Sequence, residues 1–331
     1  MTTPAFPAAR PRRLRQAPFI RELVREHRLA PGQLIQPLFV AERAEAGPIA
    51  TMPGQKRFTV DELAAECHQL ESLGIQAVAL FPALNTKLKD ATGSAALDAD
   101  GLIPRSIKAI KAAAPNLGVI TDVALDPYTD HGHDGVLTDD GHIDNDASVE
   151  LLRQQALLLA RAGADVVAPS DMMDGRIGMI RTVLERDQRP NTLILAYSAK
   201  YASGFYGPFR DAVGSKKALR GDKRTYQMDP ANSDEALREV AMDIKEGADI
   251  VMVKPALPYL DIVRRVKDRF ALPTFAYQVS GEYAMLKAAG ANGWLDEKKV
   301  VLEALLSIHR AGADAILTYF ARDVAKWLAH D

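Results

Sequence analysis

The chain has 331 residues, of which 47% are hydrophobic and 25% are charged, and its formal net charge is −2. This composition is typical of a large globular protein, and the near-neutral charge argues against nucleic acid as the main partner, because neutralising phosphates takes a surplus of Lys and Arg. The single cysteine, Cys67, excludes an intramolecular disulfide and a multi-cysteine zinc site within one chain. No apolar run approaches the length of a membrane span, so we expect a cytoplasmic protein without membrane contacts.

Residues 1–31 differ in composition from the rest of the chain. Seven arginines lie between Arg10 and Arg28, and the segment lacks the apolar core of a secretory signal. The stretch FIRELVREHRLAPG, which begins at Phe19, has its apolar residues at amphipathic helical spacing. We predict an N-terminal arm over residues 1–31 that packs on the body of the protein or on a neighbouring subunit, with a disordered tail as the alternative. Residues 32–331 are then the catalytic domain.

Short apolar runs recur along residues 32–331 and alternate with amphipathic segments. Most are continuously hydrophobic, which is typical of parallel strands that are buried on both faces. Three helix ends share a Gly-Ala-Asp sequence, in RAGADVV, KEGADIV and RAGADAI, where glycine ends a helix and the next strand begins. This alternation favours a (β/α)8 TIM barrel, with an open doubly wound sheet as the alternative. The eight predicted strands span residues 34–40, 77–81, 118–125, 165–169, 192–198, 249–254, 274–279 and 315–320.

Polar residues gather at the predicted carboxyl ends of these strands, where (β/α)8 barrels carry their active sites. Lys254 ends the sixth strand after the buried run IVMV, so it is either a desolvated amine that forms a Schiff base or half of a buried ion pair. Lys200 is expected just beyond the fifth strand, close to Lys254, and two neighbouring ammonium groups lower each other's pKa. A solvated loop lysine is the alternative interpretation of Lys200. The other candidates at strand ends are Asp122, Asp126, Ser170, Asp171, Asp174, Tyr277, Ser280 and Tyr319.

A long segment, YASGFYGPFRDAVGSKKALRGDKRTYQMDP (201–230), follows Lys200 and carries glycines, aromatic residues and a basic cluster. A loop of this kind over a barrel mouth is typical of a lid. Arg210, Lys223 and Arg224 are candidates to bind a substrate carboxylate, with Arg210 as a bidentate fork. A solvated basic loop is the alternative interpretation.

The stretch DVALDPYTDHGHDG, from Asp122 to Gly135, holds four aspartates and two histidines. Taken alone it suggests a metal site, because carboxylates and imidazoles are common metal ligands. Placed at the third strand end, it instead becomes part of the barrel mouth that holds the two lysines. We expect His131 and His133, on a glycine-containing turn, to be hydrogen-bonded loop histidines rather than ligands.

Four segments resemble the porphobilinogen synthase (5-aminolevulinate dehydratase) family, in the order in which that family has them. They are SAKYASGFYGPFRDA (198–212), YQMDPAN (226–232), GADIVMVKPALPY (247–259) and YQVSGEYAM (277–285), and the likeness runs from about Arg10 to the C-terminus. The resemblance implies a (β/α)8 barrel whose N-terminal arm wraps a partner subunit in a homo-octamer or a hexamer. It also implies the condensation of two 5-aminolevulinate molecules to porphobilinogen with loss of two waters, an early step of tetrapyrrole (haem, chlorophyll, cobalamin) biosynthesis.

The resemblance implies a role for each candidate residue. Lys254 resembles the lysine that forms the Schiff base with the A-side substrate, and Lys200 the one that binds the P-side substrate. Asp122 is expected to help position a base or a polarised water for proton removal. The expected carboxylate-binding residues are Arg210, Lys223 and Gln227 on the A side and Ser280 and Tyr319 on the P side, with Tyr277 as a further substrate contact.

Metal use is where the sequence departs from many relatives. Zinc-dependent members place three cysteines where this chain has Ala124, Asp126 and Asp134, so a soft-ligand zinc site is not expected. Asp126 and Asp134 suit Mg2+, or else a carboxylate or a lysine takes over the metal's task. Glu239 matches a position that carries an allosteric Mg2+ in many bacterial relatives.

Two other functions stay open from the residues alone. One is a class I aldolase, which uses a single Schiff-base lysine on a (β/α)8 barrel, and the other is a barrel that serves as a non-catalytic scaffold. No GxGxxG follows a strand and no GxxxxGK[ST] occurs, so no organic cofactor is expected. The presence of two candidate lysines beside a carboxylate-binding lid favours the dehydratase reaction over both alternatives.

Overall fold

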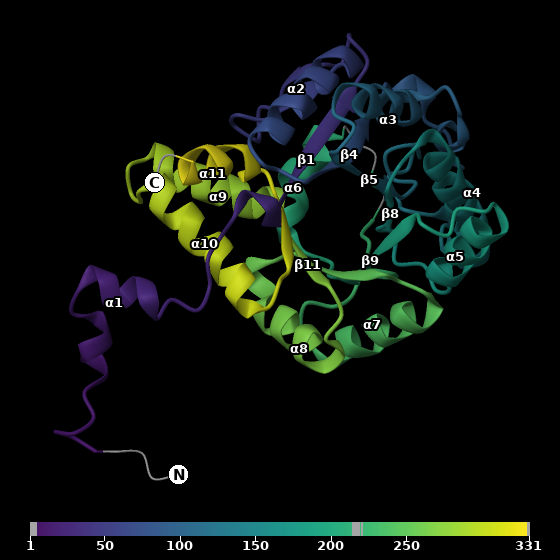
Figure 1. The fold of residues 1–331 in the computed structure, drawn as a ribbon. Helices are drawn as coiled ribbons and strands as arrows, with labels where there is room; N and C mark the ends of the chain where they lie inside the picture. Colours follow the sequence, from purple (N-terminus) through teal and green to yellow (C-terminus); the bar gives the residue numbers. More distant parts are fainter. Residues whose placement is uncertain (1–4, 214–218, 220, 330–331) are drawn as a thin grey trace.

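Eight parallel strands form a closed barrel in the computed structural model, which describes residues 5–213, 219 and 221–329 (Figure 1). Closure is shown by the pairing of the last barrel strand with the first, which places Leu34 opposite Ile316. The predicted (β/α)8 barrel is therefore confirmed, and the open-sheet alternative is wrong. The barrel strands are β1 (Leu34–Ala41), β4 (Ala77–Ala83), β5 (Gly118–Val123), β8 (Val166–Pro169), β9 (Leu193–Lys200), β10 (Ile250–Lys254), β11 (Thr274–Gln278) and β12 (Ala315–Thr318).

Helices surround the barrel as an outer ring (Figure 1). The Gly-Ala-Asp junctions work as predicted, because Gly163, Gly247 and Gly312 end their helices with φ of 110°, 108° and 120°, a backbone region that favours glycine. No helix among the described residues is long and apolar enough to cross a membrane. The surrounding helices are α2 (Val60–Ser72), α3 (Leu102–Ala113), α4 (Asn145–Ala162), α5 (Arg176–Arg186), α7 (Asp234–Glu246), α8 (Leu260–Phe270), α9 (Ser280–Ala291), α10 (Glu297–Ala311) and α11 (Ala321–Leu328).

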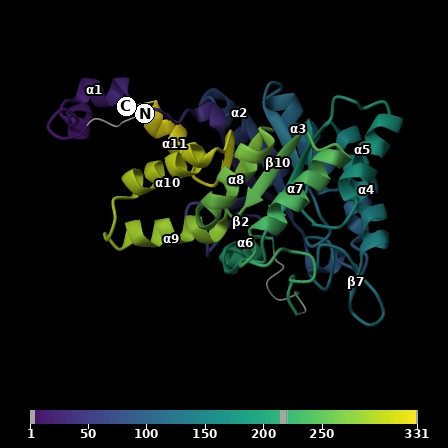
Figure 2. The ribbon, with the colours of Figure 1, turned by 90° about the horizontal axis from the view of Figure 1, so that it is seen from below.

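Three insertions lie around the barrel. Strands β2 (Gly47–Pro48) and β3 (Lys56–Phe58) extend the sheet beyond β1, and β6 (Val136–Leu137) pairs with β7 (Ile143–Asp144) between β5 and α4. The predicted lid contains the short helices η5 (Gly204–Tyr206) and α6 (Gly207–Ala212), and α6 lies beside α9 (Figure 2). Residues 214–218 and 220 of the predicted lid lie outside the described residues.

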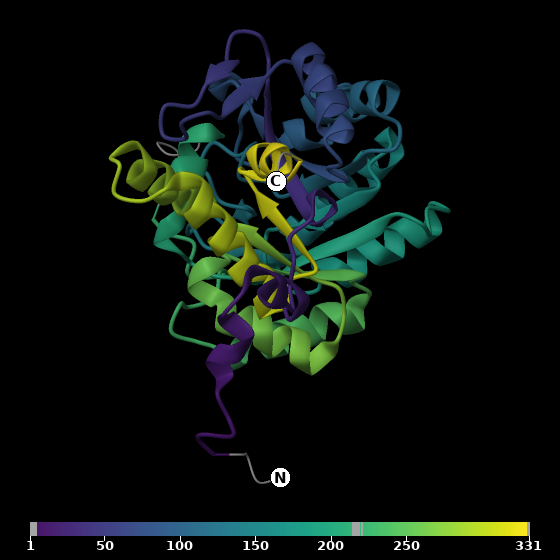
Figure 3. The same ribbon diagram turned by 60° about the vertical axis from the view of Figure 1, so that its left-hand side comes forward.

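Where the N-terminal arm joins the barrel it contacts the body, because the His27 ring lies 5.5 Å from that of His309 and Leu29 packs against the core. The outer part of the arm stands away from the barrel (Figures 1 and 3). It contains η1 (Pro11–Arg15) and α1 (Pro18–Leu23), and neither helix buries a residue. Phe19 and Leu23 expose most of their apolar side chains to solvent. Packing of α1 on the body of its own chain is thus not observed, and contact with a neighbouring subunit stays a prediction.

Candidate active site

Lys200 and Lys254 lie side by side at the carboxyl ends of neighbouring strands. They are register partners in the β9–β10 pair, and both are buried, with 5% and 6% of their surface exposed. Lys200 is the last residue of β9, whereas the sequence predicted it beyond the strand; the difference arises because β9 runs two residues further than its apolar pattern. The two lysines therefore lie next to each other at the barrel mouth, as the strand assignment predicted.

The Lys254 amine faces aromatic rings. No hydrogen bond or ion pair of its ammonium nitrogen is found among the described residues, which leaves the amine in an apolar environment unlike an ion pair. Cation–π distances from Lys254 Nζ to ring centres are 4.7 Å for Tyr277, 5.1 Å for Tyr197, 5.2 Å for Phe209 and 5.3 Å for Tyr206. Burial away from water disfavours the charged form of this lysine, although the ring faces themselves attract a cation.

Two buried groups of the mouth have pKa values near neutrality. Burial, reinforced by the charge of Lys200, lowers the pKa of Lys254 to about 7. Burial raises the pKa of Asp122, on β5, to about 7, although the charge of Lys254 and a hydrogen bond with Ser170 oppose the rise. Asp122 Oδ1 is buried without a hydrogen-bond partner among the described residues. An amine and a carboxyl group of similar pKa are suited to exchange protons at neutral pH.

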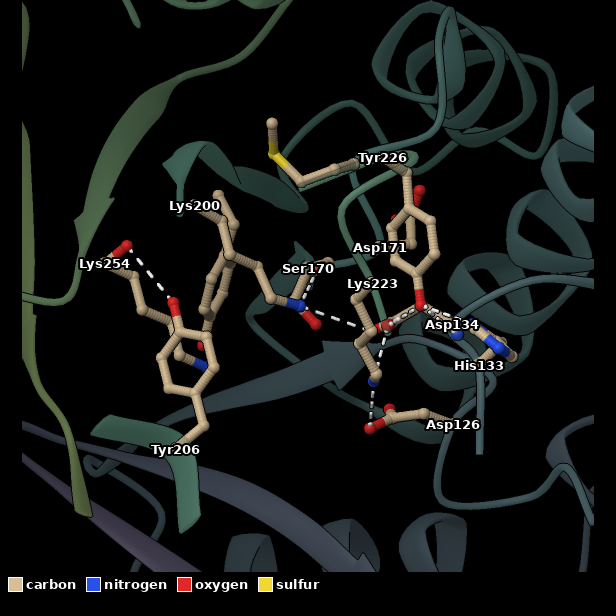
Figure 4. A network of polar contacts seen from close by, with 12 residues as sticks. Asp126, His133, Asp134, Ser170, Asp171, Lys200, Tyr206, Lys223, Tyr226 and Lys254 are labelled. Carbon is tan, nitrogen blue, oxygen red and sulfur yellow. Dashed lines mark hydrogen bonds and ion pairs between the residues drawn. The ribbon is translucent and has the colours of Figure 1, made fainter. Parts of the chain in front are cut away.

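Lys200 and Lys223 bind the carboxylates of the aspartate-rich stretch (Figure 4). Lys200 Nζ lies 3.2 Å from Asp134 Oδ1 and also donates to the Ser170 carbonyl. Lys223 Nζ lies 2.6 Å from Asp134 Oδ2 and 3.2 Å from Asp126 Oδ2. Burial acts to raise the pKa of Asp134, but the two ammonium charges outweigh burial and hold it well below its usual range.

The histidines of the same stretch have hydrogen-bond partners, as expected. His131 Nε2 lies 3.1 Å from the Ala91 carbonyl, and the His133 amide donates to His131 Nδ1 over 3.2 Å. His133 Nδ1 lies 3.1 Å from the hydroxyl of Tyr226, which in turn donates to Asp134 Oδ2 over 3.0 Å. Within the described ranges, no group of three or more His, Cys, Asp or Glu residues is arranged to hold a metal ion.

The lid covers the two lysines and leaves little space beneath it. Lid residues bound a cavity of about 30 Å3, which has room for no more than one or two waters. Entry of a larger molecule therefore requires the lid to move. The cavity is lined by Asp126, Lys200, Tyr206, Phe209, Arg210, Lys223, Gln227 and Lys254.

The other side of the mouth carries hydroxyl groups. Tyr277, on β11, and Tyr319 are buried, and their hydroxyl oxygens lie 2.8 Å apart. Tyr319 follows the last residue of β12, whereas the sequence predicted it within the strand. Ser280, the first residue of α9, accepts a hydrogen bond from the Phe209 amide over 2.9 Å. The Tyr277 ring also lies 4.7 Å from Lys254 Nζ, so this pair of hydroxyls is next to that amine.

Two predicted site residues lie apart from the lysines. Glu239, on α7, lines a separate cavity of about 390 Å3 together with Asp174 and Glu235, and Gln227 is shared with the cavity beneath the lid. Burial raises the pKa of the half-buried Glu239. Arg224 is largely exposed, its Nε lies 3.7 Å from Asp222 Oδ2, and it lines the Glu239 cavity and not the lysine cavity.

Sequence reasoning missed the tyrosines that complete the site. Tyr197 and Tyr206 contact the Lys254 amine, and Tyr226 binds Asp134. Tyr206 belongs to the aromatic run that precedes Arg210, so the composition of the lid contained a signal for it. Tyr226 begins the segment YQMDPAN, which carries the resemblance, so it had a signal too. Tyr197 had none, because the face of β9 on which it lies depends on tertiary structure.

Comparison with known proteins identifies relatives over nearly the whole chain. The relative from Bradyrhizobium diazoefficiens, "Delta-aminolevulinic acid dehydratase", is 55% identical over 322 residues, which cover 97% of this chain and 91% of the relative. The protein of the same name from Synechocystis is 52% identical over 327 residues, which cover 98% of this chain and 99% of the relative.

A solved structure has the same fold. It is the crystal structure of delta-aminolevulinic acid dehydratase (porphobilinogen synthase) from Toxoplasma gondii ME49 in complex with the reaction product porphobilinogen. The two chains superpose with a TM-score of 0.95 at 51% sequence identity, covering 97% of this chain and 92% of the other. The family model for delta-aminolevulinic acid dehydratase matches residues 8–327. The chain therefore belongs to the delta-aminolevulinic acid dehydratase family.

Proposed function

We propose that the chain condenses two 5-aminolevulinate molecules to porphobilinogen through imines at Lys254 and Lys200. One observation carries the imine chemistry: two buried lysines are register partners on β9 and β10, beneath a lid. A class I aldolase needs only one such lysine. The family model that matches residues 8–327 is that of a dehydratase, which argues against both an aldolase and a non-catalytic scaffold.

Lys254 is the first nucleophile in this proposal. Its pKa of about 7 leaves a large fraction of the amine neutral at neutral pH, and only the neutral amine attacks a ketone. Loss of water then gives a protonated imine, which makes the adjacent carbon more acidic. Asp122, whose pKa is also about 7, is suited to take up or return a proton at this stage, directly or through a water.

The remaining steps join the two substrates. The carbon next to one imine loses a proton and attacks the imine carbon of the other substrate. The lysine on the attacked carbon then leaves as a proton is lost from the neighbouring carbon. A substrate amine displaces the other lysine as the ring closes, and a last proton loss gives the pyrrole. One C–C bond and one C–N bond form, the two ketone oxygens leave as two waters, and both lysines are regenerated. Lys200, beside Asp134 and Ser170, is placed among groups that can accept and donate protons during the second imine step.

We infer two substrate subsites, and the contacts support an assignment of the lysines that differs from the one implied by the resemblance. Lys254 lies against Tyr277, whose hydroxyl contacts that of Tyr319, so these residues support a subsite for the P-side substrate. Lys200 shares the Asp134 carboxylate with Lys223. We therefore assign Lys254 to the P-side substrate and Lys200 to the A-side substrate, the reverse of the assignment made from sequence.

The carboxylate-binding groups follow this division. Ser280 and Tyr319 are proposed to bind the P-side carboxylate, and Arg210, Lys223 and Gln227 the A-side carboxylate. These last three residues line the cavity beneath the lid with both lysines, and support for the A side comes from Lys223, which shares the Asp134 carboxylate with Lys200. An arginine and a lysine are the side chains best suited to a substrate carboxylate.

We infer that the reaction proceeds without zinc. The positions of the three family cysteines hold Ala124, Asp126 and Asp134, which offer no thiolate. Asp126 and Asp134 are moreover both engaged by Lys223, whose ammonium lies between them. A fixed positive charge at this point supports the interpretation that Lys223 takes over the electrostatic task that a metal ion has in zinc-dependent relatives.

Glu239 is proposed to bind an allosteric Mg2+. Mg2+ in proteins is usually held by one or two carboxylates and keeps several of its waters. Glu239, Glu235 and Asp174 line a cavity of about 390 Å3, which has room for a hydrated ion; the three carboxylates are not grouped to ligate it together, so Glu239 would hold an Mg2+ that keeps most of its waters. Gln227 forms part of the same wall, so an ion here lies next to the lid.

We further propose a cytoplasmic homo-octamer or hexamer in which the arm contacts a partner subunit. The exposed apolar side chains of α1, among them Phe19 and Leu23, support a partner surface for the arm. The single buried cysteine, Cys67, fits a reducing compartment. Sedimentation of the full chain and of a variant carrying Phe19→Ser and Leu23→Ser tests the role of the arm, since the variant is expected to form smaller assemblies.

The proposed reaction is tested by a colorimetric porphobilinogen assay on metal-depleted enzyme, with Lys254→Met and Lys200→Met as variants. Porphobilinogen is expected from the wild-type enzyme at one molecule for two molecules of 5-aminolevulinate, and none from either variant. Absence of product from the folded wild-type enzyme, with or without Mg2+, contradicts the proposal. Restoration of activity by zinc alone contradicts zinc independence.

A further inference from the structure

The lid helix α6 carries residues that the proposed reaction needs. Arg210 is proposed to bind the A-side carboxylate, and the Phe209 ring lies 5.2 Å from Lys254 Nζ. The cavity beneath the lid is too small for a substrate, so substrate binding requires α6 to move from the closed position seen here. The contacts that hold α6 closed therefore affect substrate binding.

One side of α6 is held by α9. The Phe209 amide donates to Ser280 Oγ over 2.9 Å. Gly281 lies so close to the lid that a Cβ at this position would be 2.4 Å from the Phe205 carbonyl oxygen. These contacts explain how the lid rests on α9, but they involve only the part of the lid that precedes Arg210.

The other side of α6 is held by the insertion after β1, which contains β2 and β3 (Figure 2). Arg57 Nε donates to the Ala212 carbonyl over 2.7 Å, and Arg57 Nη2 donates to the Asp211 carbonyl over 2.8 Å. Thr51 Oγ1 adds a hydrogen bond of 2.7 Å to the Asp211 carboxylate. The last carbonyls of a helix have no partner within the helix, so a guanidinium group is well suited to bind both.

Arg57 is itself fixed to the barrel. It lies on β3 and pairs in register with Phe39 of β1, a buried strand of the barrel wall. The Phe39 ring in turn lies 5.7 Å from the ring of Phe209 in α6. Arg57 thus connects a rigid strand with the end of a short helix that begins and ends within the lid.

We propose that Arg57 is a positioning residue that latches the lid helix α6 in its closed position and thereby sets the place of Arg210. Arg210 is bracketed on both sides, because Phe209 is bound by Ser280 and Asp211 is bound by Arg57. The inference rests on the proposed role of Arg210 in substrate binding. When the two Arg57 hydrogen bonds are removed, the Thr51 hydrogen bond is the one of these three that still holds the end of α6 after Arg210. The closed position of the lid is then less populated.

The test combines hydrogen exchange with kinetics on the full-length enzyme. The variants are Arg57→Ala, Arg57→Lys and Thr51→Val. The matched control is Lys56→Ala, which removes a cation from the neighbouring position of β3 that pairs with Glu62 instead of the lid. Exchange is measured by mass spectrometry without substrate, for a peptide covering residues 204–213 and for one covering β10.

In Arg57→Ala we expect exchange in residues 204–213 to rise by about tenfold or more, because two charge-assisted hydrogen bonds are lost, while β10 stays as protected as in the wild type. KM for 5-aminolevulinate is expected to rise by a similar factor, roughly tenfold, with a smaller change in kcat. Arg57→Lys should be intermediate, since an ammonium lacks the fork that binds both carbonyls. Thr51→Val is expected to have a smaller effect of the same kind.

Several outcomes overturn the proposal. The proposal is wrong if residues 204–213 exchange as slowly in Arg57→Ala as in the wild type. It is also wrong if Lys56→Ala speeds exchange of these residues as much as Arg57→Ala does. Faster lid exchange with an unchanged KM refutes the link to Arg210. If Arg57→Ala does not fold, Arg57→Lys and Thr51→Val decide by the same criteria. Because exchange is measured without substrate, failure of the latch is distinguishable from failure of the proposed reaction, which would show as an inactive wild-type enzyme.

Discussion

Replacing Lys223 with methionine tests the proposed replacement of a metal by a lysine. Methionine keeps an unbranched side chain but removes the ammonium between Asp126 and Asp134. The side chains of Lys223 and Asp134 are buried, with 10% and 1% of their surface exposed. The variant therefore leaves the buried carboxylates with one cation fewer, and Lys200 remains as the ion-pair partner of Asp134.

The expected loss follows from the two contacts that disappear. Breaking a buried ion pair by removing one partner costs about 3–5 kcal/mol, and hydrogen bonds to charged groups contribute about 1.5–3 kcal/mol each. One of the two contacts, to Asp126, is long at 3.2 Å, and Lys200 still neutralises part of the charge. We therefore expect the free energy of unfolding to fall by about 3 kcal/mol at pH 7, at the lower end of that range.

The loss should depend on pH in a defined direction. In the wild type the pKa of Asp134 is depressed, so its contribution to stability is present above the unfolded-state pKa of about 3.9 and is lost only as the pH falls through the folded-state pKa. In Lys223→Met, one of the two ammonium charges that counteract the effect of burial is gone, so the pKa of Asp134 rises. Protonation then relieves the buried charge at lower pH, so the difference between variant and wild type should shrink from pH 8 to pH 5.

Urea unfolding at fixed protein concentration measures this difference at pH 5, 7 and 8. Lys223→Arg is the control, because it keeps the cation and should lose less than half as much stability. A loss below about 1 kcal/mol, in the range of an exposed ion pair, would refute the reasoning. So would a loss that is the same at all three pH values.

Three further predictions follow from other parts of the site. Because the pKa of Lys254 is lowered to about 7, kcat/KM should rise with pH through about 7 and then level off; a rise that continues towards pH 10 contradicts a desolvated amine. Gly281→Ala should raise KM by roughly tenfold while circular dichroism stays as in the wild type, because the new Cβ overpacks against Phe205; an unchanged KM shows that the lid does not rest there. Glu239→Ala should lose any stimulation by Mg2+ in rate measurements and keep the activity seen without Mg2+, and stimulation equal to that of the wild type excludes Glu239 as the ligand.

The barrel and its lysines were predictable because their signals are local. Each buried strand has its own apolar run, and each Gly-Ala-Asp junction marks a helix end, so eight strands followed from the sequence. Lys254 was recognisable since a lysine directly after IVMV has no ordinary place in a core strand. The function followed from longer motifs, which resemble one family.

The arrangement around the lysines was less predictable because it depends on pairing between distant segments. Between Val251 and Val253 of β10, the register with β9 shifts from Ala196 to Ala199, so β9 contains an extra residue there. Such a bulge changes which side chains face the barrel mouth, and simple alternation along β9 does not reveal it. The contact of Lys223 with Asp126 joins residues 97 positions apart, and neither segment contains a local pattern that predicts it.

Trapping of the imines tests the central claim most directly. The enzyme is mixed with isotopically labelled 5-aminolevulinate, reduced with borohydride and digested, and the modified peptides are identified by mass spectrometry. We predict a labelled secondary amine at Lys254 and, at saturating substrate, at Lys200 as well, with neither adduct when borohydride is added before substrate has bound. Formation of porphobilinogen without an adduct at either lysine would contradict the account.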